Sequence, residues 1–345
     1  MGIKTINLYF KWLLLICGVV AFILLTIVNY HINEEFSSGI VYYVLSLMIP
    51  FIIVLNMILL IYWAIIRDLR ILIPLLALLI NYRALMLIFG FNLLTSVKSP
   101  SENITVASLN VNYFRSGADV VNVSEVSNIV ARERVDIVAF QEFEENDYYN
   151  LNEIKGEFDY LPYCTADFSS FNKTGTVIFS RYPIVRSMNI SYTGTKNGIV
   201  WADIAIGRDT IRLFSNHLHT TGVSKNMGEG FGYIIQDAYK NYGLRALQAK
   251  RIRHIADTSS YPVIMCGDFN DTPFGRCTSI LMGNNLKDSF TEAGKWAGGT
   301  YLSRWFFARI DYILVDSKFV VNEYKTIPEK ISDHKMIISK VVYRN

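Results

Sequence analysis

The hydrophobic pattern divides the chain into an apolar first part and a mixed second part. From Trp12 to Asn33 and from Phe36 to Ile66 no Asp, Glu, Lys or Arg occurs. Each of these runs is long enough to cross a bilayer as a helix. A third apolar stretch reads ILIPLLALLINYRALMLIFGFNLL. We therefore predict an anchor of three transmembrane helices within residues 1–95, at about 12–33, 40–66 and 71–94.

Two features of this anchor have competing interpretations. Lys4 and Lys11 followed by an apolar run also fit a cleaved signal peptide. That run is long, lacks a small-x-small cleavage site and precedes further hydrophobic segments, which favours an uncleaved anchor. Arg83 would lie near mid-bilayer in the third helix, at a cost of roughly 2.5–3.5 kcal/mol. It would contact either polar groups inside the bundle or a lipid phosphate, and we favour the first.

The charges between the apolar runs predict the orientation. Lys4, Lys11, Arg67 and Arg70 are expected in the cytoplasm, and the His31–Ser38 loop with its two glutamates outside. Three spans would then place the rest of the chain on the outer, periplasmic face of the plasma (inner) membrane. Two spans would leave it in the cytoplasm. We prefer three.

The second part, residues 104–345, follows a polar, proline-interrupted linker at 96–103. Short β-rich runs alternate with polar turns and a few amphipathic stretches. Such a strand-rich pattern with flanking helices predicts a sheet core covered by helices. The expected helices are SEVSNIVARERV and Tyr239–Asp257. The expected strands are ITVASLNV, DIVAFQE, TGTVIFS, GIVWADIAI, TIRLFSNHL, YPVIMCGDF, RIDYILV and MIISKVVY.

Composition adds two constraints to this picture. The 345 residues have a mean hydropathy of +0.26, which is unusual for a purely soluble enzyme. Six of the 33 basic and three of the 30 acidic residues lie in 1–100, which leaves 27 of each in the second part. A duplex-binding domain usually has a basic face, and this balance neither shows nor excludes a local one. Four cysteines without CxxC spacing argue against a structural zinc site.

Polar side chains gather where the predicted strands begin or end. Singly, an Asp or Asn after a strand is usually a turn residue, and a lone His is more often structural than catalytic. As a set they offer oxygen ligands suited to Mg²⁺, with Mn²⁺ as an alternative, together with amides and two histidines. The set is Asn110, Glu142, His217, Asp268, Asn270, Asp311, Asp333 and His334.

Seven short motifs carry a resemblance to a known family. In order, they are SLNVN, FQE, GTVIFSRYPI, NHLHT, GDFNDTP, RIDYILV and SDHKMI. Together, over about residues 104–343, they resemble the endonuclease/exonuclease/phosphatase superfamily, in particular a bacterial, membrane-anchored type of member. The resemblance implies a four-layer α/β sandwich, with two mixed sheets face to face and helices outside, and a metal-dependent phosphoric ester hydrolase.

The resemblance also implies a role for each residue of the set. Glu142 would be the principal metal ligand, helped by Asn110, and Asp333 would support the second side of the metal site. Asp268 would orient and deprotonate the attacking water. The other roles concern the phosphate: Asn270 would hold it in line, His334 paired with Asp311 would donate to it, and His217 would stabilise charge or assist the leaving group.

Three further features are less specific. Asn112 stands where apurinic endonucleases have an acidic residue, which argues against an abasic-site nuclease. Asn112 and Arg309 are candidates for contact with substrate, although Arg309 would equally well pack on the surface. The glycine- and aromatic-rich segment Gly222–Tyr242 would be a gating or membrane-dipping loop, or an ordinary insertion, which we prefer.

Phosphate-binding motifs do not identify the group attached to the phosphate. The anchor and the lack of basic excess favour a lipid-linked or membrane-proximal phosphate mono- or diester, with the lipid bilayer as the expected partner. The alternative is an outward-facing nuclease acting on DNA or RNA. A non-enzymatic role is disfavoured because all the motif carboxylates and histidines are present.

Overall fold

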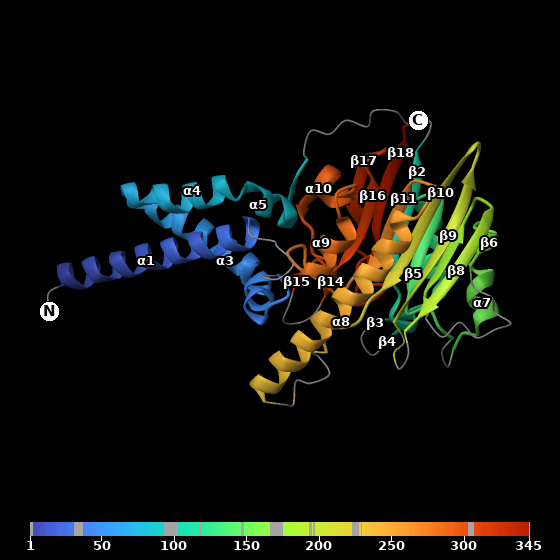
Figure 1. Ribbon diagram of the computed structural model, residues 1–345, viewed down its shortest axis with the longest axis horizontal. Coiled ribbons are helices and arrows are strands. Elements are labelled where there is room, and N and C mark those ends of the chain that lie inside the picture. The colour runs from blue at the N-terminus through green and yellow to red at the C-terminus, as the bar shows by residue number, and fades with distance from the viewer. Residues whose placement is uncertain are drawn as a thin grey trace. The chain divides into compact units, whose positions relative to one another are not determined.

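The structure is a computed structural model that describes residues 3–30, 37–92, 103–116, 119–145, 148–165, 175–192, 195, 197–222, 228, 230–302 and 307–344 (Figure 1). The chain forms two compact units. One comprises Met1–Ile88 with Phe274–Arg276, and the other comprises Phe89–Pro273 and Cys277–Asn345. Each unit is described in turn.

The first unit contains two long apolar helices, α1 (Ile3–Tyr30) and α3 (Ile40–Ile65). The segments Asn7–Asn29 and Ile40–Ile65 are long and apolar enough to cross a membrane. Helices are therefore present at the first two predicted positions. They are followed by the 3₁₀ turn η1 (Leu69–Ile71) and two short helices, α4 (Leu72–Ile80) and α5 (Tyr82–Ile88).

The predicted continuous third helix at 71–94 is wrong. The chain breaks at Asn81, where the axes of the Leu69–Ile80 and Tyr82–Ile88 helices differ by 68°. The Asn81 side chain donates to Ala77 O at 2.9 Å and to Thr26 Oγ1 at 3.1 Å. Asparagine bonded to nearby backbone competes with the helical pattern, which accounts for the break. Residues 89–91 form a strand, and most of the predicted 96–103 linker lies outside the described residues.

The second unit is built on two six-stranded sheets. In spatial order, the first sheet contains β17 (Phe319–Thr326), β18 (Ile337–Tyr343), β2 (Ile104–Asn110), β5 (Ile137–Gln141), β7 (Val177–Ser180) and β6 (Tyr163–Cys164). The second sheet contains β12 (Leu286–Asp288), β16 (Asp311–Asp316), β11 (Val263–Asp268), β10 (Asp209–His217), β9 (Gly198–Ile206) and β8 (Ile184–Ser191).

Short strands complete the unit. The pairs are β1 (Phe89–Phe91) with β13 (Lys295–Ala297), β3 (Arg115–Ser116) with β4 (Asp119–Val120), and β14 (Tyr301–Leu302) with β15 (Phe307–Ala308).

Apolar clusters lie between the sheets and on both outer faces. The central cluster joins residues of both sheets, such as Val106 and Ile137 from the first and Leu213 and Ile264 from the second. Alternate side chains of one strand point to opposite faces of its sheet. The remaining buried side chains of these strands therefore face the helices outside.

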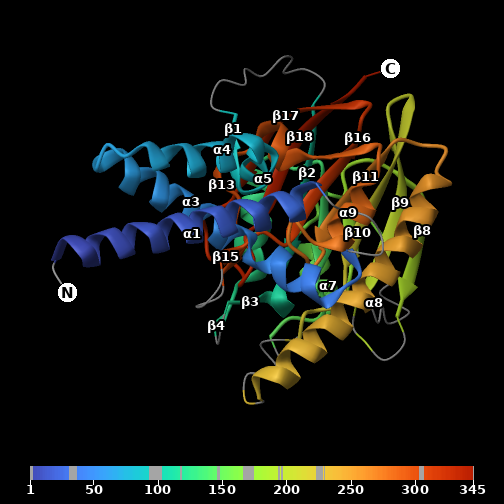
Figure 2. The same ribbon diagram turned by 60° about the vertical axis from the view of Figure 1, so that its left-hand side comes forward.

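Helices cover the outer face of each sheet. The first sheet is covered by α6 (Val123–Arg132) and α7 (Leu151–Gly156). The second is covered by α8 (Phe231–Asp257) and α9 (Arg276–Met282). These four layers confirm the predicted sandwich (Figures 1 and 2).

Several elements were not predicted, among them the strands β8 and β17, the short helices α7, α9 and α10 (Ser289–Ala293), and the first part of α8. β8 has five consecutive exposed residues and so lacks the alternation expected of a half-buried strand. β17 was also missed. The Gly222–Tyr242 segment is partly helical, because α8 begins at Phe231 within it, and its positions 223–227 and 229 lie outside the described residues.

Candidate active site

The sheet registers bring the polar strand ends to one edge of the sandwich. β2 and β5 are parallel, with Asn110 opposite Gln141, and β10 and β11 are parallel, with His217 opposite Asp268. The carboxyl ends of these four strands therefore meet. β16 and β18 run antiparallel to β11 and β2, so their first residues, Asp311 and Ile337, lie at the same edge. This topology explains why residues far apart in sequence become neighbours.

Glu142 lies immediately after β5, where the backbone turns sharply. Its φ of 51° is in the left-handed region, which is uncommon for residues other than glycine. Gly175, with φ of 57°, lies against this turn, and a Cβ there would be 3.4 Å from the Glu142 Cα. Asn110 Nδ2 donates to Glu142 Oε1 at 3.1 Å. The turn and the amide together fix a carboxylate that is 22% exposed.

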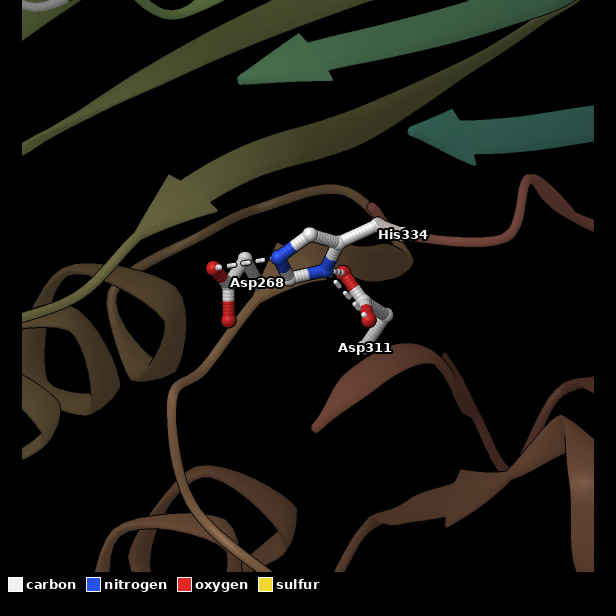
Figure 3. A group of neighbouring side chains, drawn as sticks. All are labelled: Asp268, Asp311 and His334. Carbon is white, nitrogen blue, oxygen red and sulfur yellow. Dashed lines mark hydrogen bonds and ion pairs between the residues drawn. The ribbon is translucent and has the colours of Figure 1, made fainter. Parts of the chain in front are cut away.

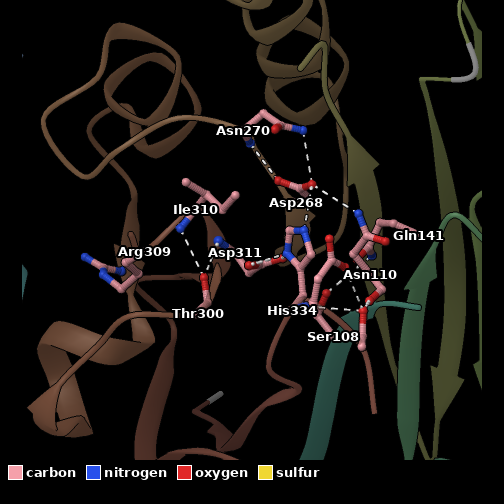
Figure 4. Close-up of polar contacts among 12 residues, drawn as sticks. Ser108, Asn110, Gln141, Asp268, Asn270, Thr300, Arg309, Ile310, Asp311 and His334 are labelled. Carbon is pink, nitrogen blue, oxygen red and sulfur yellow. Dashed lines mark hydrogen bonds and ion pairs between the residues drawn. The ribbon is translucent and has the colours of Figure 1, made fainter. Parts of the chain in front are cut away.

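Asp268 is the buried carboxylate at the centre of the site. Its Oδ2 accepts from Asn110 Nδ2 at 3.2 Å and from Asn270 Nδ2 at 3.0 Å, and its Oδ1 accepts from Asn270 N at 2.8 Å (Figure 4). Burial raises the pKa of Asp268 to about 7, against the opposing effect of the nearby His334 cation. A carboxylate with a pKa near neutrality can accept a proton at physiological pH.

His334 lies between two aspartates (Figure 3). Its Nδ1 is 3.1 and 3.0 Å from the two oxygens of Asp311, and its Nε2 is 3.9 Å from Asp268 Oδ2. Burial lowers the pKa of His334, but the carboxylates of Asp311, Asp268 and Asp333 outweigh that effect and raise it to about 10. The imidazole is therefore a cation at neutral pH, held by Asp311 with Nε2–H directed to the other side.

His217 is the second histidine of the site, and its pKa is shifted in the opposite direction to that of His334. It is 4% exposed at the end of β10, with Nε2 at 3.4 Å from Glu142 Oε1. Burial lowers its pKa to about 3, reinforced by the charge of His334. The ring is therefore neutral at pH 7 and can donate a hydrogen bond without adding positive charge.

The oxygen donors of the site fit a hard divalent cation. Burial raises the pKa of Glu142, and the negative charges of Asp333 and Glu144 add to that rise. A carboxylate with two further negative charges nearby favours a bound cation. Asp268, Asp311 and His334 also lie close enough to hold a metal, but the bond between His334 Nδ1 and Asp311 makes that group better suited to a His–carboxylate pair.

Asn110 and Asn270 act as links between the charged groups. The Nδ2 of Asn110 bonds both Glu142 and Asp268, while its Oδ1 accepts from Asn112 N at 3.0 Å. Asn270 has a φ of 51° and also donates to Leu218 O at 3.0 Å. Both amides are thus placed to orient Asp268.

The two predicted substrate contacts differ in position. Asn112 lies beside Asn110 and donates to Arg115 O at 3.4 Å. Arg309 is directed away from Asp268 (Figure 4). Its side chain is 4% exposed and donates to Asp288 Oδ2 at 2.5 Å. The guanidinium also lies over the rings of Phe290 and Tyr312, at 4.6 and 4.8 Å. Arg309 is therefore packed in the interior, not on the surface or in the cluster.

Two hydroxyl residues outside the predicted set support the site. Ser332 Oγ donates to Asn110 O at 2.7 Å and accepts from His334 N at 3.2 Å. Thr300 Oγ1 accepts from Ile310 N and Asp311 N at 3.1 and 3.2 Å. Ser332 lies within the SDH motif, but its bond to the end of β2 depends on the assembled sheets. Thr300 lies in no motif.

Residues 107–334 match the model of the Endonuclease/Exonuclease/phosphatase family. The chain belongs to this family. Its members are phosphoric ester hydrolases, and divalent metals are common among them. No curated protein matches the chain in sequence.

Solved structures with a similar fold include three whose chains align with this one over almost their whole length. A family protein from Leptotrichia buccalis C-1013-b is 19% identical, with a TM-score of 0.50 over 70% of this chain and 100% of that one. One from Bacteroides thetaiotaomicron is 16% identical, with a TM-score of 0.51 over 70% and 98%. A humanized D. rerio TDP2 is 16% identical, with a TM-score of 0.52 over 70% and 99%. At these identities the similarity establishes the fold alone.

Proposed function

We propose that the chain is a membrane-anchored, Mg²⁺-dependent phosphoesterase that hydrolyses a lipid-linked or membrane-proximal phosphate mono- or diester. The observation that carries this proposal is the presence, in one chain, of a phosphoesterase-family site and two helices able to span a membrane. A site tethered in this way meets membrane-borne phosphate at a high effective concentration.

Glu142 is the proposed principal metal ligand, with Asn110 and Asp333 as the proposed further ligands. The burial of Glu142 and the negative charges of Asp333 and Glu144, which raise its pKa, support this assignment. Mg²⁺ prefers few carboxylates together with water and substrate phosphate, and Mn²⁺ accepts a similar set. When bound, the metal would polarise the phosphoryl group and offset its negative charge.

Asp268 is the proposed general base for the attacking water. Asn110 and Asn270 orient both of its oxygens, and its raised pKa matches neutral conditions. The water would lose its proton to Asp268 as it attacks phosphorus from the side opposite the leaving oxygen. Fixed orientation of the nucleophile is a major source of rate in such displacements.

The two histidines serve different parts of the reaction. The His334 cation, with Nδ1 held by Asp311, would donate from Nε2 to a non-bridging phosphate oxygen. Donors aimed at charge that develops in the transition state contribute strongly in a site of low polarity. Neutral His217 would donate a hydrogen bond to the same oxygens or to the leaving group.

The contacts of the anchor support three crossings of the membrane. At one end, the Arg70 guanidinium lies over the ring of Trp12 at 5.6 Å. At the other, Asn81 bonds Thr26 and Asn29 of α1 at 3.1 and 3.2 Å. Trp12 to Thr26 spans about 21 Å at 1.5 Å per residue, and Arg70 to Asn81 about 16 Å. The segment from Arg70 to Asn81, which contains α4, therefore lies alongside most of the α1 stretch between Trp12 and Thr26.

This arrangement favours an outward orientation of the catalytic unit. Lys11 and Arg70 both lie near Asp68, at 3.8 and 3.1 Å, and the positive-inside tendency assigns that end to the cytoplasm. The chain would leave the bundle at the opposite end, on the outer face. Arg83 follows Asn81 by two residues, so it would lie near the outer end of α1 instead of mid-bilayer.

A cysteine substitution at Ser101 tests the orientation. Modification of Ser101→Cys by a membrane-impermeant thiol reagent in intact cells is expected, with the matched Lys11→Cys reacting only after lysis. The opposite pattern would place the catalytic unit in the cytoplasm.

The substrate is tested with the full-length protein in lipid nanodiscs. We expect Mg²⁺-dependent release of phosphate or headgroup from a panel of phospholipids and polyprenyl pyrophosphates, abolished by Asp268→Asn. Plasmid DNA is the matched alternative substrate. Nicking of the plasmid without lipid turnover would replace the lipid proposal with a nuclease. Activity on every substrate that survives Asp268→Asn would refute the site itself.

A further inference from the structure

An exposed aromatic surface is formed by the first strand of the catalytic unit. β1 pairs with β13, with Gly90 opposite Trp296 and Phe91 opposite Lys295. Phe91 is 57% exposed and Trp296 is 73% exposed, and Lys295 is exposed beside them. We call Phe91, Lys295 and Trp296 the β1–β13 surface. A tryptophan this exposed makes little use of its ring for packing within the chain.

The backbone of Trp296 is also unusual. Its φ of 61° lies in the left-handed region, which a bulky residue adopts only with backbone strain. Such a conformation persists where the surroundings impose it, and it is often associated with a function. Here the ring is presented outward, so the cost is not offset by burial of the side chain.

The pairing that holds this surface is specific. A Cβ on Gly90 would come within 2.1 Å of Gly294 O, so only glycine permits this approach of the two segments. Asn92 Nδ2 donates to Thr291 O at 3.1 Å and to Gly294 O at 3.2 Å. β1 is thus fixed against the segment that follows α10 (Ser289–Ala293), and Trp296 is held beside Gly90.

Chain continuity limits how far this surface can lie from the membrane. Phe89 is bonded directly to Ile88, the last residue of α5. A strand advances about 3.3 Å per residue, so Gly90 lies within roughly 7 Å of Ile88, and Trp296 is its cross-strand neighbour. The interfacial layer that amphipathic segments occupy is about 5–10 Å deep. Trp296 therefore pairs with a residue that is only two positions along the chain from the last residue of α5.

We propose that the β1–β13 surface binds the lipid–water interface of the membrane that the helices cross. Tryptophan is enriched at such interfaces because its ring is apolar and its indole N–H is polar. The Lys295 ammonium beside it matches the phosphates of lipid headgroups. The occupant is a lipid surface. The proposal rests on the membrane anchoring in the proposed function, and it holds for any substrate of the catalytic site.

The fluorescence of Trp296 tests the proposal in the full-length protein. The chain has five tryptophans, so the difference in emission between wild type and Trp296→Phe isolates this residue. In vesicles of phosphatidylcholine and phosphatidylglycerol, we expect a difference spectrum shifted to shorter wavelength than that of indole in water. Lipids brominated near the headgroup end of the chain should remove most of its intensity, and lipids brominated near the methyl end should remove less.

Trp201→Phe is the matched control, because Trp201 is 3% exposed in the core of the catalytic unit. Its difference emission should not respond to bromination. Lys295→Glu provides a second variant, and it should weaken quenching of Trp296 in phosphatidylglycerol vesicles more than in pure phosphatidylcholine.

Two results would overturn the proposal. One is difference emission like that of indole in water, without quenching. The other is a shift that requires high protein density and is insensitive to brominated lipid, which would identify a second copy of the chain as the occupant. None of these readouts requires hydrolysis, so they are independent of the proposed substrate.

Discussion

His334 Nδ1 lies 3.1 and 3.0 Å from the two carboxylate oxygens of Asp311, both residues being nearly inaccessible to solvent. Asp311 is the first residue of β16 and His334 precedes β18, so the pair joins the two sheets. The carboxylate fixes the ring and keeps it protonated. Because Nε2 remains directed to the Asp268 side, the pair has the geometry of a fixed cationic donor.

Asp311→Asn should separate the two effects of Asp311 on His334, the orientation of the ring and the stabilisation of its positive charge. The carboxylate of Asp311 is a main cause of the raised pKa of His334, so its loss should lower that pKa from about 10. His334 would then lose its charge at lower pH, and the alkaline limb of the kcat profile should move to lower pH. We expect kcat at pH 8 to fall by about 10²–10³-fold, the usual effect of losing one transition-state donor.

Asp316→Asn is the matched control for this variant, because Asp316 ends the same strand and lies away from the site edge. It should leave the pH profile unchanged. An alkaline limb that stays in place in Asp311→Asn would mean that His334 does not act as the cationic donor.

Asp268→Asn should abolish hydrolysis and stabilise the metal-free fold at alkaline pH. Burial raises the pKa of Asp268 to about 7 in the folded protein, above its usual 3.8. The folded state therefore favours the protonated form, and this stability is lost as pH rises towards 7. In EDTA at pH 8, Asp268→Asn should have a higher Tm than wild type, and the difference should shrink towards pH 4.

The same pKa predicts how wild-type activity depends on pH. Asp268 must be ionised to accept a proton, so kcat should rise with pH, with a midpoint at or below about 7 because a bound cation favours the ionised form. Stopped assays in overlapping buffers measure this limb. A rate that falls as pH rises from 5 to 7 would contradict Asp268 as the base.

Glu142→Gln should weaken metal binding specifically. EDTA is expected to remove activity and Mg²⁺ to restore it. Loss of the Glu142 charge should raise the Mg²⁺ concentration needed for half-maximal activity by at least about 10-fold, since even loss of an outer-shell partner of a metal ligand typically costs about 10–100-fold in affinity. At the same Mg²⁺ concentration, the rise in Tm should be smaller in the variant than in wild type, since a ligand stabilises the folded state according to its affinity. Glu144→Gln, two residues away, is the comparison, and an equal loss there would move the proposed cation position.

The clustering of Asn110, Glu142 and Asp268 could be predicted because strand ends can be recognised in a sequence. Each of these residues comes after a run of buried apolar residues, and parallel pairing brings such ends together. The supporting groups were not predictable in this way. Ser332 bonds Asn110 O only after β18 and β2 pair across more than two hundred residues, and no local pattern encodes that contact.

The errors in the fold have equally local causes. Hydropathy counts apolar residues and so merged α4, α5 and β1 into one helix, whereas the side chain of Asn81 bonds Thr26 on another helix and ends α4. β8 was missed because an edge strand with exposed residues on both faces has no period-two pattern.

Arg309 provides a direct test of an interior role against a substrate-binding role. Arg309→Met should destabilise the fold because it leaves Asp288 buried without its cation, a change that typically costs about 3–5 kcal/mol. Asp288 also caps α10 by accepting from Phe290 N at 3.0 Å, so the damage should extend to that helix. Thermal unfolding followed by near-UV circular dichroism should show a Tm lowered by about 10 °C, with KM of the remaining folded enzyme unchanged.

Lys287→Met is the matched control, because Lys287 in β12 pairs with Glu292 in α10 at 3.4 Å while both side chains are partly exposed. Its cost should be at most about 1 kcal/mol. A guanidinium that bound substrate would give the reverse pattern for Arg309→Met, with a raised KM and an unchanged Tm. The contrast between the two variants therefore decides whether Arg309 holds the interior together or touches phosphate.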